Sequence, residues 1–313
     1  MFTNRIIVMY KINLFYLFLI CLVFALPGCR NQKENNKEGN NTFKMVEVPA
    51  IITDQNETLA YIAGNFWENM DFTKQSVLKD KDNLDFNFYN FLQFVRQVPR
   101  QTAENSFRNF TEKLLRGDSL VIDHFRELTE KSLNHPNSPY RNEDLYIPFL
   151  ESLILSPKTD TTVKQNLVYQ LNLANRNRPG KRAEDFKFCN RSDRELSLYG
   201  IGSEYLLLVF IDPDCPACQI TIEQMKRSET IRKYGKRVKI LTLYTGPEYK
   251  QWVQWSEILD NSWINGYDRE MAIHKGPLYD LRPTPSLYLL DRDKVVIFKD
   301  APLQTIEEYL AKC

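Results

Sequence analysis

Hydrophobic and polar positions along this chain change their period once, near residue 178. Between residues 45 and 178, apolar residues recur three and four positions apart, which places them on one face of a helix. Residues that break helices, such as Pro99 and Gly117, separate the periodic stretches. We therefore predict a bundle of about six helices over residues 45–178. The predicted helices are Leu59–Asn69, Phe86–Arg96, Thr102–Arg116, Leu120–Leu133, Asn142–Leu155 and Thr161–Ala174.

Aromatic residues are concentrated in the first part of this helical region. We interpret them as a hydrophobic core rather than a cofactor site, because aromatic residues at helical spacing usually pack together. His124 and His135 have no metal-ligand spacing and are expected to be solvated or to cap turns. The aromatic residues are Phe66, Trp67, Phe72, Phe86, Phe88, Tyr89, Phe91 and Phe94.

The pattern after Arg178-Pro179-Gly180 changes to short apolar runs that are typical of strands. The run Tyr205–Ile211 is apolar at every position, as in a strand buried on both faces. We predict a small α/β sandwich over residues 179–313, which gives the whole chain an α+α/β fold class. The predicted strands cover residues 186–188, 195–198, 205–211, 238–244, 286–290 and 295–298, and the predicted helices end near residues 233, 259 and 312.

The N-terminus has the pattern of an export signal, in which basic residues precede an apolar stretch over residues 12–25. The run Leu26-Pro27-Gly28-Cys29 resembles the lipobox of bacterial lipoproteins. That resemblance implies that residues 1–28 are removed and that Cys29 is acylated. Polar residues 29–44 then form a flexible tether, and the protein is expected in the cell envelope, lipid-anchored and facing the periplasm. An uncleaved membrane anchor is the alternative, and it would also export the rest of the chain.

Composition narrows the range of functions. The 313 residues include 41 Lys+Arg and 40 Asp+Glu, a formal net charge of +1, which provides no basic surface for nucleic acid. Three histidines argue against a histidine-rich metal centre. Six cysteines are too few for a disulfide scaffold at this length, so each must be judged by its position. We expect no nucleic-acid partner, no metal and no cofactor.

One cysteine pair stands where redox chemistry is expected. Cys215-Pro216-Ala217-Cys218 follows the buried strand and opens a helix. Free backbone N–H groups and the helix dipole favour a thiolate on Cys215, and proline suits the first helical position. Cys218 lies one turn later and can attack a mixed disulfide on Cys215. The spacing therefore predicts that Cys215 is the exposed attacking thiol and that Cys218 is the buried resolving thiol.

Three other interpretations of the pair fit the sequence less well. Half a zinc site would need a second Cys-x-x-Cys or a histidine pair, and the sequence has neither. A static disulfide would be unusual in so tight a loop at the start of a helix. A binding module with incidental cysteines is the third. The strand–turn–helix context favours redox activity over all three.

A proline-rich loop supports the redox interpretation. Arg282-Pro283-Thr284-Pro285 comes directly before a predicted strand, a place where proline is tolerated and a cis bond is a specific feature. With this loop, the region from about residue 180 resembles the TlpA-type periplasmic group of thioredoxin-like domains. The resemblance implies that Cys215 and Cys218 form the redox pair, that Pro285 is the cis-proline, and that Thr284 pairs its backbone with a substrate chain.

The resemblance extends upstream of the redox motif. The block at residues 137–146, together with Asp212-Pro213-Asp214-Cys215, is similar to bacterial lipoproteins that join a helical domain of unknown function to a thioredoxin-like domain. The resemblance covers nearly the whole mature chain. It implies the architecture, and it assigns no activity to the helical part.

The sequence departs from thioredoxin in the acids around the pair. Thioredoxin has a buried Asp six residues before its first active-site Cys, where this chain has Val209. Some TlpA-type proteins have a Glu three residues after the second Cys, where this chain has Thr221. Glu223 or Asp212 would have to accept the proton of Cys218 instead. Asp212 and Asp214 place negative charge beside Cys215, which opposes the thiolate. We therefore expect a Cys215 pKa closer to that of thioredoxin than to that of a strong oxidant, which favours a reducing role.

The expected function is an envelope thiol–disulfide oxidoreductase that acts as a reductant or in disulfide interchange. Its expected partners are protein thiols or disulfides, an electron donor that the sequence does not identify, and the membrane through the lipid anchor. The alternative is a non-catalytic, lipid-anchored scaffold with a thioredoxin fold. A thiol peroxidase is disfavoured because such sites place the reactive Cys beside Thr and Arg rather than in Cys-x-x-Cys.

The remaining candidates carry weaker predictions. Cys189 is expected to be a buried thiol and Cys313 an exposed one, and a disulfide between them is left open. Cys21 leaves with the signal. His274 is expected on the surface, although it lies in the segment before the proline-rich loop. Three tryptophans are expected to pack the second helix of the α/β region, with a substrate groove as the minor alternative; they are Trp252, Trp255 and Trp263.

Overall fold

The computed structural model of the protein describes residues 43–282 and 284–313, which belong to one compact unit. The predictions for the signal sequence, for Cys29 and for nearly all of the tether fall outside these residues. Among the helices that are described, none combines the length and the apolar character needed to cross a membrane. The chain has a helical N-terminal region followed by an α/β region, as the sequence predicts.

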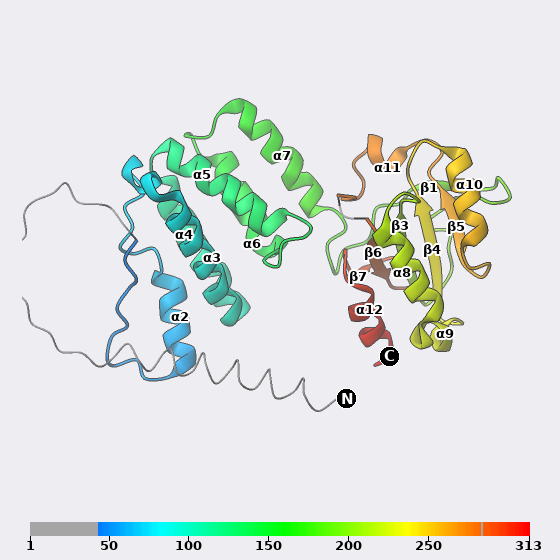
Figure 1. Cartoon of the computed structure of the whole chain (residues 1–313), viewed down its shortest axis with the longest axis horizontal. Helices are drawn as coiled ribbons and strands as arrows, with labels where there is room; N and C mark the ends of the chain where they lie inside the picture. Colours follow the sequence, from blue (N-terminus) through cyan, green and yellow to red (C-terminus); the bar gives the residue numbers. More distant parts are fainter. Residues whose placement is uncertain (1–42, 283) are drawn as a thin grey trace, which may run out of the picture. The chain divides into compact units, whose positions relative to one another are not determined.

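Helices make up the first region (Figure 1, blue to green). Each of the six predicted helices is present. The end of the predicted helix Leu120–Leu133 is a separate π-helical turn, η2 (Glu130–Asn134), and the 3-10 helix η1 (Gln75–Asp80) was not predicted. The α-helices are α2 (Gln55–Asn65), α3 (Lys81–Gln97), α4 (Arg100–Leu115), α5 (Ser119–Thr129), α6 (Glu143–Leu155) and α7 (Thr161–Asn175).

Capping side chains explain where the first helices begin. The Asp54 carboxylate accepts from the N–H of Glu57 at the start of α2, and the Asp80 carboxylate accepts from the N–H of Asn83 at the start of α3. The apolar pattern begins only after these polar first turns. The predicted starts, at Leu59 and at residue 86, are therefore too late.

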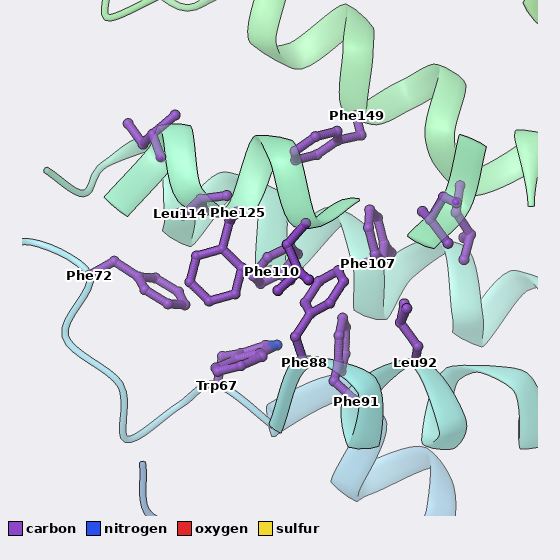
Figure 2. Packing of buried hydrophobic residues seen from close by; sticks show 14 of the residues in the cluster. Trp67, Phe72, Phe88, Phe91, Leu92, Phe107, Phe110, Leu114, Phe125 and Phe149 are labelled. Atoms are coloured by element: carbon purple, nitrogen blue, oxygen red, sulfur yellow. The ribbon is translucent and has the colours of Figure 1, made fainter. Parts of the chain in front are cut away.

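The core of the helical region is a cluster of aromatic rings (Figure 2). Phe110 lies at its centre, with ring centroids 5.4 Å from Phe125, 5.5 Å from Phe91 and 5.6 Å from Trp67. Such pairs add to the free energy gained from burial. The interpretation of these rings as core is correct with one exception: Phe86 is 63% exposed, because it lies on the outward face of α3.

A mixed seven-stranded sheet forms the centre of the α/β region, with strand order β2-β1-β5-β4-β3-β6-β7. Strand β3 pairs parallel with β4 and antiparallel with β6. The apolar run that predicts β3 therefore lies in the interior of the sheet. The strands are β1 (Lys187–Asn190), β2 (Glu195–Ser197), β3 (Tyr205–Ile211), β4 (Val238–Tyr244), β5 (Ile264–Tyr267), β6 (Ser286–Leu290) and β7 (Val296–Phe298).

Alternate residues of β3 enter two separate cores, one on each face of the sheet. Leu207 and Val209 pack in the core that includes residues of α8 and α12, whereas Leu206 and Leu208 pack with residues of β1 and α11. Figure 1 shows these helices around the sheet. The helices are α8 (Pro216–Arg227), α9 (Glu229–Tyr234), α10 (Tyr249–Ile258), α11 (Ala272–Lys275) and α12 (Leu303–Leu310).

Two elements of the α/β region differ from the prediction. The predicted helix after the cysteine motif is two helices, because the Ser228 hydroxyl accepts from the N–H of Ile231 and starts α9. Strand β5 was not predicted, since its sequence contains Asn265 and Gly266. Tertiary contacts account for both residues: the Asn265 amide oxygen accepts from the hydroxyl of Thr242, and a Cβ on Gly266 would lie 2.7 Å from the ring of Phe188.

Ion pairs join residues of the helical and α/β regions within the compact unit. The Lys299 ammonium lies 2.8 Å from the Glu143 carboxylate and donates to the backbone oxygen of Arg176. The Lys299 side chain is only 5% exposed, and this burial lowers its pKa against the opposing effect of Glu143. Arg141 pairs with Asp300 nearby. These contacts are charged and largely shielded from solvent, so removal of one partner would leave the other poorly compensated.

Candidate active site

The cysteine motif begins where β3 ends and α8 starts. Cys215 is the N-cap residue of α8, and its sulfur accepts from the N–H of Cys218 at 3.3 Å. Pro216 occupies the first turn, where no backbone donor is needed. The preceding turn is closed by the N–H of Cys215, which donates to the carbonyl of Asp212 at 3.1 Å. The structure therefore places the Cys215 sulfur at the positive end of a helix.

The two thiols differ in exposure and in acidity. Burial raises the pKa of Cys215, but hydrogen bonds with Cys218, with Thr284 and with the Ala217 backbone outweigh it, so that the pKa lies below the ordinary value. Burial raises the pKa of Cys218 to about 12, against a lowering hydrogen bond from the N–H of Asp212. Cys218 is completely buried, whereas Cys215 is half-buried. This difference agrees with the assignment of Cys215 as the more reactive thiol.

The loop before β6 lies against Cys215. Phe210 near the end of β3 pairs with Ser286 at the start of β6. This register places Thr284 and Pro285, which come just before β6, next to the cysteine motif that follows β3. The Cys215 thiol donates to the carbonyl oxygen of Thr284 at 3.3 Å, and the Thr284–Pro285 peptide bond is cis. Cys215, Cys218, Thr284 and Pro285 are therefore brought together, while their roles toward a substrate stay predictions.

The two candidate proton acceptors for Cys218, Glu223 and Asp212, differ in their position relative to this thiol. Val209 is fully buried and apolar. Glu223 forms ion pairs with Lys226 and Arg227 on the surface of α8, where it is engaged away from the thiol. Asp212 lies beside Cys218: its N–H donates to the Cys218 sulfur at 3.4 Å, and its negative charge raises the pKa of that thiol. Of the two acids, Asp212 is thus the one next to the resolving cysteine.

Sequence analysis missed a polar connection beside the motif. The Gln251 amide of α10 donates to the Asp214 carboxylate at 2.7 Å, and the Tyr244 hydroxyl donates to the Gln251 amide oxygen at 2.7 Å. Gly246 leaves space for this hydroxyl, because a Cβ there would lie 2.3 Å from it. A glutamine on a surface helix carries no local signal of such a role.

The structure also gives the positions of the remaining tryptophan, cysteine and histidine candidates in the α/β region. Trp252 is buried and stacks on Tyr267, with ring centroids 5.5 Å apart, and the other two tryptophans of the region are also buried. Cys189 is a buried free thiol and Cys313 an exposed one, so the structure contains no disulfide between them. His274 is exposed and lies 3.1 Å from the hydroxyl of Thr245. Within residues 43–282 and 284–313, no group of three His, Cys, Asp or Glu side chains is arranged to hold a metal ion.

Comparison with known proteins identifies relatives of both regions. A family model described as a domain of unknown function, DUF5106, matches residues 27–177. The chain is similar to the crystal structure of a thioredoxin-like protein from Bacteroides caccae ATCC 43185, with 33% sequence identity and a TM-score of 0.81. That match covers 87% of this chain and 98% of the other, so it extends over both regions.

Two shorter structures match less than half of this chain. The C-terminal domain of an uncharacterized protein from Bacteroides fragilis NCTC 9343 is 41% identical, with a TM-score of 0.43, and the match covers 43% of this chain and 98% of that one. A domain of a possible thiol-disulfide isomerase from Cytophaga hutchinsonii ATCC 33406 is 23% identical, with a TM-score of 0.39, and the match covers 44% and 94% of the two chains. No curated protein matches this chain.

Proposed function

We propose that this chain, which belongs to the family of thioredoxin-like proteins, is a thiol–disulfide oxidoreductase that acts on protein substrates. The observation that carries the proposal is the inequality of its two thiols. Cys215 is half-buried at a helix N-terminus with a lowered pKa, and Cys218 is buried with a pKa of about 12. A reactive thiolate next to a thiol that stays protonated is suited to a disulfide exchange in two steps.

In the first step, the Cys215 thiolate attacks one sulfur of a substrate disulfide. The substrate S–S bond breaks, a mixed disulfide forms on Cys215, and the other substrate sulfur leaves as a thiolate that takes up a proton. In the second step, Cys218 loses its proton and attacks the Cys215 sulfur, which releases the second substrate thiol. The substrate gains two electrons, and the Cys215–Cys218 pair becomes a disulfide.

Deprotonation of Cys218 is the demanding part of the second step, because its pKa of about 12 leaves little thiolate at neutral pH. We assign the acceptor role to Asp212, whose backbone N–H already contacts the Cys218 sulfur. The N–H group would stabilise the thiolate while the carboxylate receives the proton. The acid that thioredoxin uses for this purpose is replaced here by the apolar Val209.

We propose that the Thr284–Pro285 loop binds the substrate chain through backbone hydrogen bonds. Its carbonyl oxygen lies 3.3 Å from the Cys215 sulfur, so a segment that pairs with this backbone would bring its own disulfide to the attacking atom. Main-chain pairing recognises an extended peptide and leaves the side chains free. The proposed substrate is therefore a class of proteins with accessible disulfides rather than one sequence.

We further propose that the pair works in the reducing direction. Negative charge on Asp212 and Asp214 opposes the helix dipole at Cys215, so its thiolate is less strongly stabilised than in an oxidant. A dithiol electron donor must then return two electrons to the Cys215–Cys218 disulfide after each turnover.

The proposed location is the cell envelope, with acylated Cys29 as the anchor. Replacement of Cys29 by Ala in the full-length protein tests this directly. The unsubstituted protein should sediment with membranes and carry a lipid mass on its first residue, and the variant should lose both. An unmodified N-terminus on the membrane-bound protein would support the uncleaved anchor instead.

The experiment that tests the activity is capture of the mixed disulfide. A Cys218→Ser variant cannot resolve the first intermediate, so it should remain covalently bound to substrate proteins and be released by dithiothreitol. The matched control is the Cys215→Ser, Cys218→Ser double variant, which should capture nothing. Equal capture by both variants, or none by either, would contradict the activity and leave a scaffold role as the better account.

A further inference from the structure

Arg282 connects the Thr284–Pro285 loop to the rest of the molecule through a set of fixed hydrogen bonds. It lies two residues before Thr284 in the chain. Its backbone N–H and its Nε both donate to the Asp280 carboxylate, at 3.2 and 2.8 Å, and its Nη2 pairs with the same group. Asp280 is 5% exposed, so this carboxylate is a buried and well-defined acceptor.

A further hydrogen bond of Arg282 leads to the helical region. Its Nη2 donates to the amide oxygen of Asn134 at 2.9 Å, across 148 residues of sequence. Asn134 is the last residue of the π-helical turn η2 and is 6% exposed. Turns of this kind are uncommon and recur at functional sites. A buried amide at the end of such a turn is held by its surroundings and can fix the direction of the guanidinium.

The neighbours of Asn134 are themselves held by hydrogen bonds. Asn134 interacts with the hydroxyl of Tyr146, a residue whose burial raises its pKa. The Tyr146 hydroxyl donates to Gln170, and the Gln170 amide donates to Glu130 at 2.9 Å. The amide of Asn134 is therefore part of a connected polar network, in which each group limits the movement of the next.

A cavity of about 390 Å³ borders the bond between Asn134 and Arg282. Residues of both regions line it, among them Asn166, Tyr169 and His274. Because water can reach this space, removal of the Asn134 amide would leave Arg282 hydrated rather than buried and unpaired. Loss of the bond should therefore change the position of the loop more than the stability of the fold.

We propose that Asn134 of the helical region positions the Thr284–Pro285 loop against Cys215, with Arg282 as the connecting residue. The connection runs from Asn134 to the guanidinium of Arg282, which lies two residues before Thr284 in the sequence, and from the Thr284 carbonyl to the Cys215 sulfur. This inference rests on the proposed function. It gives the helical region a role in binding the substrate chain, because main-chain pairing requires the loop to be held at one distance from the attacking sulfur.

The test compares two disulfides that differ in their need for the loop. Insulin presents a polypeptide that can pair with the Thr284 backbone, whereas the small aromatic disulfide DTNB reacts without such pairing. Asn134→Ala should raise the KM for insulin about tenfold, the usual effect of losing one hydrogen bond to a charged group. Its rate with DTNB and its kcat with insulin should stay within about twofold, since the thiols are unchanged.

Two variants serve as controls. Tyr169→Phe removes a hydroxyl from a residue that lines the same cavity but lies outside the network that holds Asn134, and it should keep the KM of the unsubstituted protein. Asn134→Asp retains an oxygen acceptor for the guanidinium and should restore most of the lost affinity. A general structural effect of residue 134 would not be rescued in this way. If Asn134→Ala fails to fold, Arg282→Lys makes the same test, since lysine keeps the charge but cannot bond to both partners.

Each outcome decides the inference. A raised KM for insulin in Asn134→Ala, with normal DTNB reduction and rescue by Asn134→Asp, supports it. Equal KM values for Asn134→Ala, Tyr169→Phe and the unsubstituted protein would overturn it while leaving the proposed function intact. Failure of the unsubstituted protein to reduce either disulfide would overturn the proposed function and this inference with it.

Discussion

The helical region and the α/β region both bury many aromatic side chains, but they use them differently. In the helical region, Phe110 and its neighbours fill one continuous core between helices. In the α/β region, buried side chains lie on two faces of a sheet, and the reactive groups lie where β3 ends and before β6 begins. In this protein the large aromatic cluster forms a core, whereas the proposed chemistry belongs to residues at the ends of two adjacent strands.

In the α/β region, we expect the greatest loss of activity from replacement of the proposed attacking thiol. Cys215→Ser should reduce disulfide exchange with insulin to background, a loss of at least about 100-fold, because a serine hydroxyl does not form the nucleophile at neutral pH. Turbidity from precipitating insulin chains gives the rate. Cys313→Ser is the matched control, since it removes an exposed cysteine at the far end of the chain from the motif. Equal losses in both variants would contradict the assignment of the attacking thiol.

In the helical region, the second prediction concerns the stability of the fold rather than the activity. Phe110→Ala removes a buried ring from the middle of the core and should lower the free energy of unfolding by about 3–5 kcal/mol. Urea denaturation followed by circular dichroism measures this change. Phe86→Ala is the control, because that ring is exposed, and it should cost less than about 0.5 kcal/mol. A reversed order would mean that the core is wrongly described.

The resolving step offers a third prediction. Asp212→Asn removes the proposed proton acceptor beside Cys218 and should slow release of the mixed disulfide about tenfold or more. Attack by Cys215 should be much less affected. Single-turnover reactions with insulin, quenched with acid and separated on gels, distinguish the two steps. Glu223→Gln is the control, and a larger effect there would show that Asp212 is not the acceptor.

The fourth prediction concerns the pH at which each of the two cysteines becomes reactive. The pKa of Cys215 is lowered, so its thiolate and its alkylation by iodoacetamide should appear at a lower pH than for an ordinary cysteine. The pKa of Cys218 is raised to about 12, so this thiol should remain unmodified at neutral pH and react only in strongly alkaline solution. Peptide mapping after alkylation across a pH series measures both. Simultaneous alkylation of the two cysteines would contradict the described difference.

The smallest expected effect concerns the polar connection at Asp214. Gln251→Ala should free the Asp214 carboxylate to turn toward Cys215 and should raise the pKa of that thiol slightly, with a change in alkylation rate of about twofold to threefold at neutral pH. Gln254→Ala on the same helix is the control, because that side chain is exposed. Identical alkylation rates in the two variants would mean that Gln251 has no influence on the site.

Local patterns predicted much of the fold and the position of the reactive pair. The bounds of β3, β4 and β6 follow from continuous apolar runs, and the Cys-x-x-Cys spacing locates the motif at the start of α8. Such features depend on residues close together in sequence. They can therefore be read without knowledge of the fold.

Contacts between distant residues could not be predicted in this way. Strand β5 contains Asn265 and Gly266, which suit their positions only because Thr242 and Phe188 lie beside them. The bond between Asn134 and Arg282 spans 148 residues and has no local pattern at either end. The boundary predicted between residues 178 and 179 stays a prediction, because ion pairs and hydrogen bonds join the two regions within one compact unit.

The central claim is that Cys215 and Cys218 interconvert between two thiols and a disulfide. An equilibrium titration against dithiothreitol or glutathione, with alkylation and mass measurement at each potential, tests it most directly. We expect a two-electron transition with a midpoint nearer to the value of about −270 mV for thioredoxin than to about −120 mV for a strong oxidant. A pair that stays in one state across the whole range, or a midpoint near −120 mV, would contradict it.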